Sequence, residues 1–244
     1  MLPAQPRQLR VMRRAVERWA ALVGLSDEVL DDLQYALGEA AANAVEHAYG
    51  DTVDGEFHYT LDHRPGPDGG VAVQVRDFGR WRPVPTDSGH RGRGVQVLHA
   101  VGTDVRIDSD DGGTTVTFRV PVPAAAAPRR PRPAPRHSWP TGTAPVTSVI
   151  DTEPHVLRVS GDLDLDGVAS VRAALLDAVG SGPLAVDLHD TGYVSSAGVA
   201  LLVELAMRAR ARGTSLTLRV IAGSPVARVL ELTGLRSTLP VVVG

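Results

Sequence analysis

The sequence predicts an α+β two-layer sandwich in its first half and an α/β domain in its second half. Two amphipathic helices come before a set of short strands in the first half, whereas strands and helices alternate in the second half. A proline- and arginine-rich segment separates the halves. The length of 244 residues suits two ordinary domains, and 43% hydrophobic with 22% charged residues is a globular composition.

The first half opens with two predicted helices. The apolar residues of the first recur at spacings of three and four, which marks one buried helix face: Leu9, Met12, Val16, Trp19 and Val23. Gly24 ends this helix, and Ser26-Asp27-Glu28 starts the second one. The apolar face of the second helix consists of Val29, Leu33, Ala36, Leu37, Ala40 and Ala44.

The rest of the first half predicts strands with one short helix among them. Strands are expected at residues 57–61, 71–75, 105–107 and 115–120, and the helix at 94–101. The turn-rich residues 63–70 join the first two strands. Such a succession predicts a mostly antiparallel sheet covered by helices.

The second half alternates between the two kinds of element, which favours parallel strand pairing. A strand at residues 156–159 leads into a polar turn at 161–164. The elements that follow are a helix from 168 to 178, a strand at 184–188, a helix at 199–211, a strand at 215–221, a helix at 225–232 and a last strand at 241–243.

A linker is predicted between the domains. Residues 121–146 contain eight prolines and four arginines and almost nothing that could pack. Such segments are extended spacers, and these 26 residues would span on the order of 80 Å at ~3.1 Å per residue. A basic docking segment is the alternative. The expected domains are therefore 1–120 and 147–244.

Two residue types are absent. The chain has no cysteine, and its 25 basic residues are all arginine. Disulfides, cysteine-bound zinc, Schiff-base lysines and the Walker-type P-loop are thereby excluded. The net charge of −3 gives no reason to expect nucleic acid as a partner. With no apolar run of ~20 residues and no signal peptide visible, we expect a cytoplasmic protein without a membrane span.

Polar residues on the second helix and after a strand are the first candidates for chemistry. Glu39 and Asn43 lie four residues apart and share a helix face, with His47 in the same row. Their oxygens suit Mg²⁺, or the carboxylate could accept a proton; the alternative is a solvated polar face. The Asp77 carboxylate could accept a hydrogen bond from a donor such as an exocyclic amine, and Gly79 would let the ligand approach the backbone closely. The alternative is that these residues only form a turn at the end of the strand.

Two further segments could handle phosphate. The glycine-rich stretch up to Gly92 and Gly94 precedes a helix, so its N–H groups suit a phosphate, although such loops are common. Ser195 and Ser196 lie between a buried strand and a helix. Either hydroxyl could cap the helix or, as an exposed group at a helix N-terminus, could accept a phosphate.

Four strings occur in a fixed order: EAAANAVEHAY, VQVRDFG, GRGVQVL and GTTVTF. Together they resemble the N, G1, G2 and G3 boxes of the histidine-kinase-like (GHKL) ATPase superfamily, most of all its anti-sigma-factor serine kinases. The resemblance covers residues 8–120 and implies a Bergerat-type ATPase fold that binds ATP with Mg²⁺. It further implies that Asn43 holds Mg²⁺ and that Glu39 is the catalytic base.

The same resemblance assigns the nucleotide contacts. Asp77 would read the adenine amine with Thr114 beside it, and Gly92 and Gly94 would meet the phosphates. Where the family has D-x-G-x-G, the second glycine is Trp81 here, and the expected lid from Arg80 to Arg91 is short. No phosphoacceptor histidine helix precedes the fold, which argues against a two-component histidine kinase.

The second half resembles another family. VSGDLDLDGV and VDLHDTGYVSSAGVALL are similar to the STAS domain of anti-sigma-factor antagonists, over residues 147–243. The resemblance implies that Ser196 accepts a phosphate from the partner kinase, with Ser195 as second choice. The family usually has an aspartate at the position of Ser195.

Together the two resemblances imply a bacterial partner-switching regulator. The kinase domain would phosphorylate its own or a sister STAS domain and would hold a sigma factor, while a PP2C-type phosphatase would reset the serine. A homodimer is also expected. The alternative is a non-catalytic, nucleotide-sensing module that clamps the STAS domain or a sigma factor. Either one could be the C-terminal part of a larger sensor–phosphatase protein.

Overall fold

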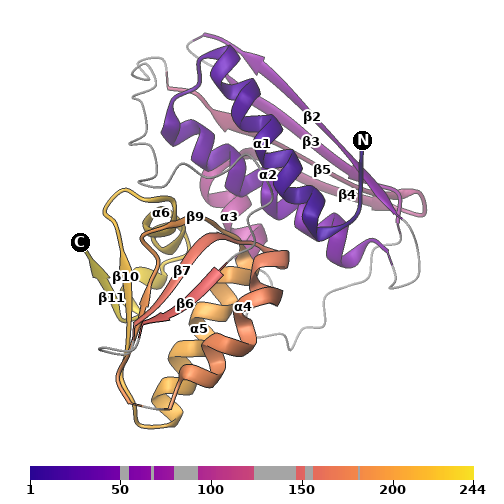
Figure 1. Ribbon diagram of the computed structural model, residues 1–244. Helices are drawn as coiled ribbons and strands as arrows, with labels where there is room; N and C mark the ends of the chain where they lie inside the picture. Colours follow the sequence, from indigo (N-terminus) through magenta and orange to yellow (C-terminus); the bar gives the residue numbers. More distant parts are fainter. Residues whose placement is uncertain (50–54, 67–68, 80–92, 124–146, 152–155, 181) are drawn as a thin grey trace. The chain divides into compact units, whose positions relative to one another are not determined.

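The computed structural model describes the chain except for residues 50–54, 67–68, 80–92, 124–146, 152–155 and 181 (Figure 1). For residues 93–95 and 147–151 it describes the backbone alone. The expected lid, Arg80 to Arg91, and Gly92 lie outside the described residues, as does most of the expected linker at 121–146. The chain divides into two compact units, Met1–Arg132 and Pro133–Gly244, and each is described by itself.

Two helices with well-defined ends begin the first unit. Helix α1 (Pro6–Val23) ends at Gly24, whose φ of 75° is left-handed and therefore suits a residue without a Cβ. Helix α2 (Asp27–His47) starts at Ser26, whose hydroxyl accepts a hydrogen bond from the Val29 N–H at 3.4 Å. Both helices are where the sequence predicts them.

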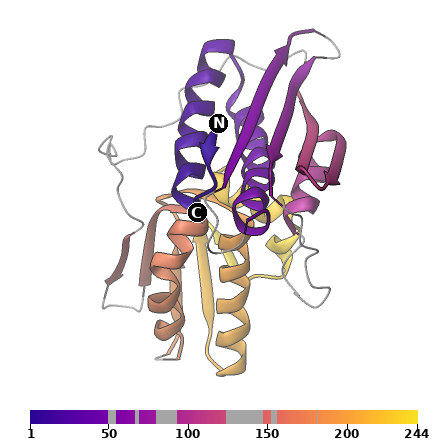
Figure 2. The same ribbon diagram turned by 90° about the vertical axis from the view of Figure 1, so that its right-hand side faces the viewer.

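The first unit contains a five-stranded antiparallel sheet. Its strands are β1 (Leu2–Pro3), β2 (Glu56–Arg64), β3 (Gly70–Asp77), β4 (Thr103–Asp110) and β5 (Gly113–Pro121), in the order β1-β2-β3-β5-β4. Helix α2 packs on β2, β3 and β5, and α3 (Arg93–Val101) packs on α2, β4 and β5. Figure 2 shows the strands with α1 and α2 on one side.

The core of this unit lies between the sheet and α2. Val71, Val73 and Val75 alternate with more exposed residues along β3, and all three are buried. They pair across the ladder with buried residues of β5, namely Val120, Phe118 and Val116. Because side chains alternate along a strand, the next inward positions are Asp77 on β3 and Thr114 on β5. The buried face of the sheet therefore ends in two polar side chains.

The second unit is built on a mostly parallel sheet. Strands β6 (Thr147–Asp151), β7 (Val156–Leu163), β8 (Leu184–Asp187), β10 (Leu216–Val220) and β11 (Val241–Val243) follow the order β11-β10-β8-β7-β6, and β9 (Thr191–Val194) pairs with β7. Every pair is parallel except β6 with β7.

Helices connect these strands. Helix α4 (Leu165–Ala178) packs on β7 and on α5 (Ser196–Ala211), which contacts β9 and β10 (Figure 1). Helix α6 (Pro225–Leu232) contacts β9 and the short 3₁₀ helix η1 (Leu235–Ser237). Both predicted fold classes are thereby confirmed. Within the described residues no helix is long and apolar enough to cross a membrane.

Some strands differ from the prediction. The polar turn expected at 161–164 is wrong for its first three residues, because β7 continues to Leu163. There it pairs with β9, which the sequence analysis missed together with β1 and β6. Asp164 then caps α4, and its carboxylate accepts the Gly167 N–H at 2.9 Å.

Candidate nucleotide and phosphoacceptor sites

A carboxylate held by the backbone is the centre of the first site. Asp77, at the end of β3, is buried with 6% exposure. Its Oδ1 accepts hydrogen bonds from the Gly79 N–H at 3.1 Å and from the Thr114 N–H at 3.2 Å. Since both donors bind Oδ1, neither engages Oδ2.

Two glycines make this arrangement possible. Gly113, the first residue of β5, has a φ of 127°, and a Cβ there would overlap the Asp77 carbonyl. The strand can therefore bring the Thr114 N–H to Asp77 only because residue 113 has no side chain. A Cβ on Gly79 would overlap the carbonyl of Ala48, the residue that follows α2. The backbone around Asp77 is therefore packed tightly against both the next strand and the end of α2.

Burial affects the charge of this carboxylate. Loss of water raises the pKa of Asp77 above its ordinary value, while the N–H groups of Thr114 and Gly79 and the nearby Arg76 act in the opposite direction. An acceptor of this kind, desolvated and fixed in direction, favours a ligand that brings a hydrogen-bond donor to it.

The other candidates of the first unit lie on α2. Glu39 is buried, with 4% exposure, whereas Asn43 and His47 are half-buried. The three residues follow one another at spacings of four along the helix, so they form one row. That row ends near Ala48, whose carbonyl is the one that Gly79 approaches.

Metal ligands are few among these residues. In the described part of the chain, no group of three or more His, Cys, Asp or Glu side chains is placed to hold a metal ion. Glu39 and Asn43 carry oxygens of the kind that bind Mg²⁺, and a protein commonly offers this ion only one or two ligands. Phosphates and water then complete its octahedron.

The serines of the second unit have different environments. Ser195 is 5% exposed and is the N-cap of α5: its hydroxyl donates to the Leu163 carbonyl at 3.1 Å and accepts from the Gly198 N–H at 3.4 Å. The predicted capping role is thus confirmed for Ser195. Ser196 is the first residue of α5 and is half-buried.

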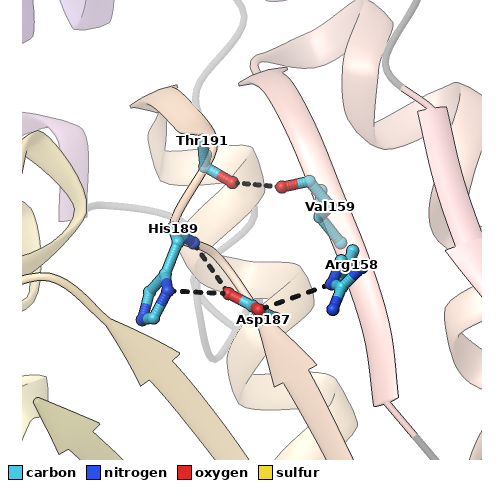
Figure 3. A network of polar contacts seen from close by, with 5 residues as sticks. All are labelled: Arg158, Val159, Asp187, His189 and Thr191. Carbon is cyan, nitrogen blue, oxygen red and sulfur yellow. Dashed lines mark hydrogen bonds and ion pairs between the residues drawn. The ribbon is translucent and has the colours of Figure 1, made fainter. Parts of the chain in front are cut away.

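A polar network holds the turn that leads to these serines (Figure 3). The Asp187 carboxylate, at the end of β8, accepts the His189 N–H at 3.0 Å and lies 3.8 Å from Nε of Arg158 on β7. The Thr191 hydroxyl, at the start of β9, donates to the Val159 carbonyl at 2.9 Å. The network joins β7, β8 and β9, which together position the start of α5.

The structure brings together some of the predicted residues. Asp77, Gly79 and Thr114 form one cluster, while Glu39 and Asn43 lie along α2. Gly94 is the second residue of α3.

Sequence reasoning assigned no role to Gly113, although it begins the string GTTVTF and is the first residue of β5. It also missed Tyr49, although it ends the string EAAANAVEHAY. The Tyr49 hydroxyl donates to the Glu56 carbonyl and accepts from the Phe78 N–H.

Comparisons with known proteins give relatives for both units. Residues 2–120 match the family model described as a histidine kinase-like ATPase domain, and residues 146–243 match the model described as Mlab, STAS domain. The serine-protein kinase RsbW of Listeria monocytogenes is 38% identical over 130 residues, which cover 47% of this chain and 81% of that protein.

Another relative and one solved structure also match part of the chain. The serine-protein kinase RsbW of Bacillus velezensis is 26% identical over 125 residues, covering 46% of this chain and 78% of that protein. A crystal structure of the RsbU and RsbW domains of a Mycobacterium tuberculosis protein is 27% identical with a TM-score of 0.41. It covers 53% of this chain, and this chain spans 32% of the solved one.

Proposed function

Because the chain belongs to the family of the serine-protein kinase RsbW and carries a STAS domain after its kinase-like domain, we propose that it is an ATP- and Mg²⁺-dependent protein serine kinase. It acts in the cytoplasm as part of a partner-switching regulator. The buried Asp77 carboxylate, held by the two backbone N–H groups of Gly79 and Thr114, carries this proposal.

The adenine amine fits the Asp77 carboxylate. An exocyclic amine donates hydrogen bonds, and Oδ2 is the oxygen that the two backbone donors leave aside. A desolvated acceptor discriminates strongly against a ligand that cannot donate to it, because the acceptor would then stay buried without a partner. The proposed substrate is therefore an adenine nucleotide, with Gly92 and Gly94 as contacts to its phosphates.

The α2 row fits the metal and the base. Asn43 would hold Mg²⁺ through its amide oxygen, in the company of the phosphates and water. When bound, the metal neutralises charge on the transferring phosphoryl group. Glu39 lies one helical turn away and would accept the proton of the attacking serine.

The transfer forms one bond and breaks another. The Ser196 oxygen bonds to the γ-phosphorus while the bond from that phosphorus to the β–γ bridging oxygen breaks, so ADP leaves. The proton of the Ser196 hydroxyl passes to the Glu39 carboxylate. The products are phosphoserine and ADP.

Local geometry favours Ser196 over Ser195 as acceptor. The Ser195 hydroxyl is buried and occupied by Leu163 and Gly198, so its use would remove the cap of α5. Ser196 is half-buried on the first turn of the helix, where the positive end of the helix dipole tolerates a phosphate. The acceptor lies in the STAS domain of the same chain or of a sister chain.

The proposed exchange of partners depends on the charge that phosphorylation of Ser196 adds. A phosphate brings about −1.5 to −2 charges to the start of α5 and would weaken contact between the kinase and STAS domains. The released kinase domain would then bind a sigma factor, and a PP2C-type phosphatase would restore Ser196. We also propose that the kinase domain forms a homodimer.

Intact-mass spectrometry of the full chain with ATP and Mg²⁺ tests the proposal. Wild type and the control Ser170→Ala, which removes an exposed serine on α4, should gain the mass of one phosphate. Glu39→Ala and Ser196→Ala should gain none. A wild-type chain that binds ATP but is never phosphorylated, alone or with a separate STAS protein, would favour the nucleotide-sensing module instead.

A further inference from the structure

The hydroxyl of Tyr49 closes the end of the β2–β3 ladder beside Asp77. Phe57 of β2 pairs with Asp77 of β3, so Glu56 and Phe78 are the next residues along the two strands. The Tyr49 hydroxyl donates to the Glu56 carbonyl at 2.5 Å and accepts from the Phe78 N–H at 2.9 Å. The side chain of Tyr49, the second residue after α2, thus takes the place of one pair of ladder hydrogen bonds.

Two glycines lie directly against the Tyr49 ring and the backbone of its neighbour Ala48. A Cβ on Gly55 would overlap the Tyr49 ring, and a Cβ on Gly79 would overlap the Ala48 carbonyl. The glycines at both positions leave the room that these groups occupy. This close packing limits the orientations of the ring and directs its hydroxyl to the space between the ends of β2 and β3.

On the sheet face opposite the Asp77 side chain, the Phe78 ring packs against two neighbouring side chains. Its ring meets His58 edge-on at 4.9 Å between centroids, and the Arg76 guanidinium lies 5.2 Å from the ring centre. Because side chains alternate along the strand, Phe78 and Asp77 point to opposite faces. The backbone between them is thus fixed by Tyr49 through the Phe78 N–H and by side-chain packing on the outer face.

We propose that Tyr49 is the positioning residue for adenine selectivity. By holding the Phe78 N–H, its hydroxyl fixes the backbone that presents the Gly79 N–H to Asp77, and so fixes the direction of the Asp77 carboxylate. Tyr49 also links the base-reading end of the site to α2, which carries Glu39 and Asn43. This inference rests on the proposed role of Asp77 in reading the amine.

Titration calorimetry of the full chain with ADP and with inosine diphosphate, both with Mg²⁺, tests the inference. The two nucleotides differ at the amine that Asp77 would read. Tyr49→Phe keeps the ring and removes only the hydroxyl. Its ADP affinity should fall about five- to tenfold, as expected for one misdirected hydrogen bond, while its affinity for inosine diphosphate should stay unchanged.

The matched control is Tyr59→Phe, which removes a hydroxyl from a half-buried tyrosine of β2. It should keep the wild-type ratio of the two affinities. If Tyr49→Phe weakens both nucleotides equally or weakens neither, Tyr49 is not a positioning residue. If wild type itself binds both equally, the role of Asp77 is wrong and the inference falls with it, so the two failures are distinguishable.

Discussion

The N-cap of α5 allows stability and phosphorylation to be separated by neighbouring substitutions. Ser195→Ala removes the acceptor of the Gly198 N–H, a capping bond whose loss costs about 1 kcal/mol. It also removes the donor to the Leu163 carbonyl, but that oxygen still accepts the Ser195 N–H at 3.1 Å and is not left unpaired. The second loss is therefore small, and we expect a total destabilisation of about 1–2 kcal/mol.

Hydrogen exchange of the full chain, followed by mass spectrometry over a urea series, measures this loss on peptides from α5. Ser195→Asp is the matched control, because aspartate is an equally good N-cap and should restore most of the stability. Ser195→Ala should still be phosphorylated on Ser196. Unchanged exchange in Ser195→Ala would refute the capping geometry, and loss of labelling in that folded variant would refute Ser196 as the acceptor.

Three further predictions concern the surroundings of Asp77. Burial raises the pKa of Asp77, so the folded state favours the protonated carboxyl group. This group therefore stabilises the folded protein below its unfolded-state pKa of about 3.9, and the contribution is lost as the pH rises through the folded-state pKa. Asp77→Asn, which cannot ionise, should therefore be at least as stable as wild type in urea unfolding at pH 7. The difference in unfolding free energy should disappear near pH 4, and the variant should bind ADP more weakly. Lower stability than wild type at pH 7 would contradict this. Gly79→Ala should lower ADP affinity more than tenfold in calorimetric titrations, because its Cβ overlaps the Ala48 carbonyl; wild-type affinity would show that the segment moves freely. Gly113→Ala should lose about 2 kcal/mol or more in thermal unfolding, against about 1 kcal/mol for Gly24→Ala, whose Cβ meets open space; equal losses would exclude the predicted overlap with Asp77.

Local patterns predicted most of the helices and strands. The end of α1 at Gly24 and the start of α2 at Ser26 follow from cap chemistry that acts within a few residues. The inward row of β3 follows from strict alternation. Three strands were missed. Strands β1 and β9 have only two and four residues and pair with distant segments, β2 and β7. Strand β6 pairs with the next strand, β7, and was missed beside the expected linker.

The candidate site was predictable to the extent that side-chain chemistry defines it. The boxes indicated Asp77 and Thr114, and in the structure the Thr114 N–H donates a hydrogen bond to the Asp77 carboxylate. The contributions of Tyr49 and Gly113 were not predictable, since a hydroxyl between two strands and a left-handed glycine are recognised only when their tertiary neighbours are known.

The contacts to Asp77 Oδ1 come from main-chain N–H groups, and this affects which sequences can form the site. Thr114 contributes its N–H, so any residue except proline can supply that bond, whereas the backbone path demands glycine at 79 and 113. Distant relatives are therefore expected to keep the carboxylate and the two glycines while the residues between them diverge. A library designed to alter base preference should vary the positions around this frame and keep these three fixed.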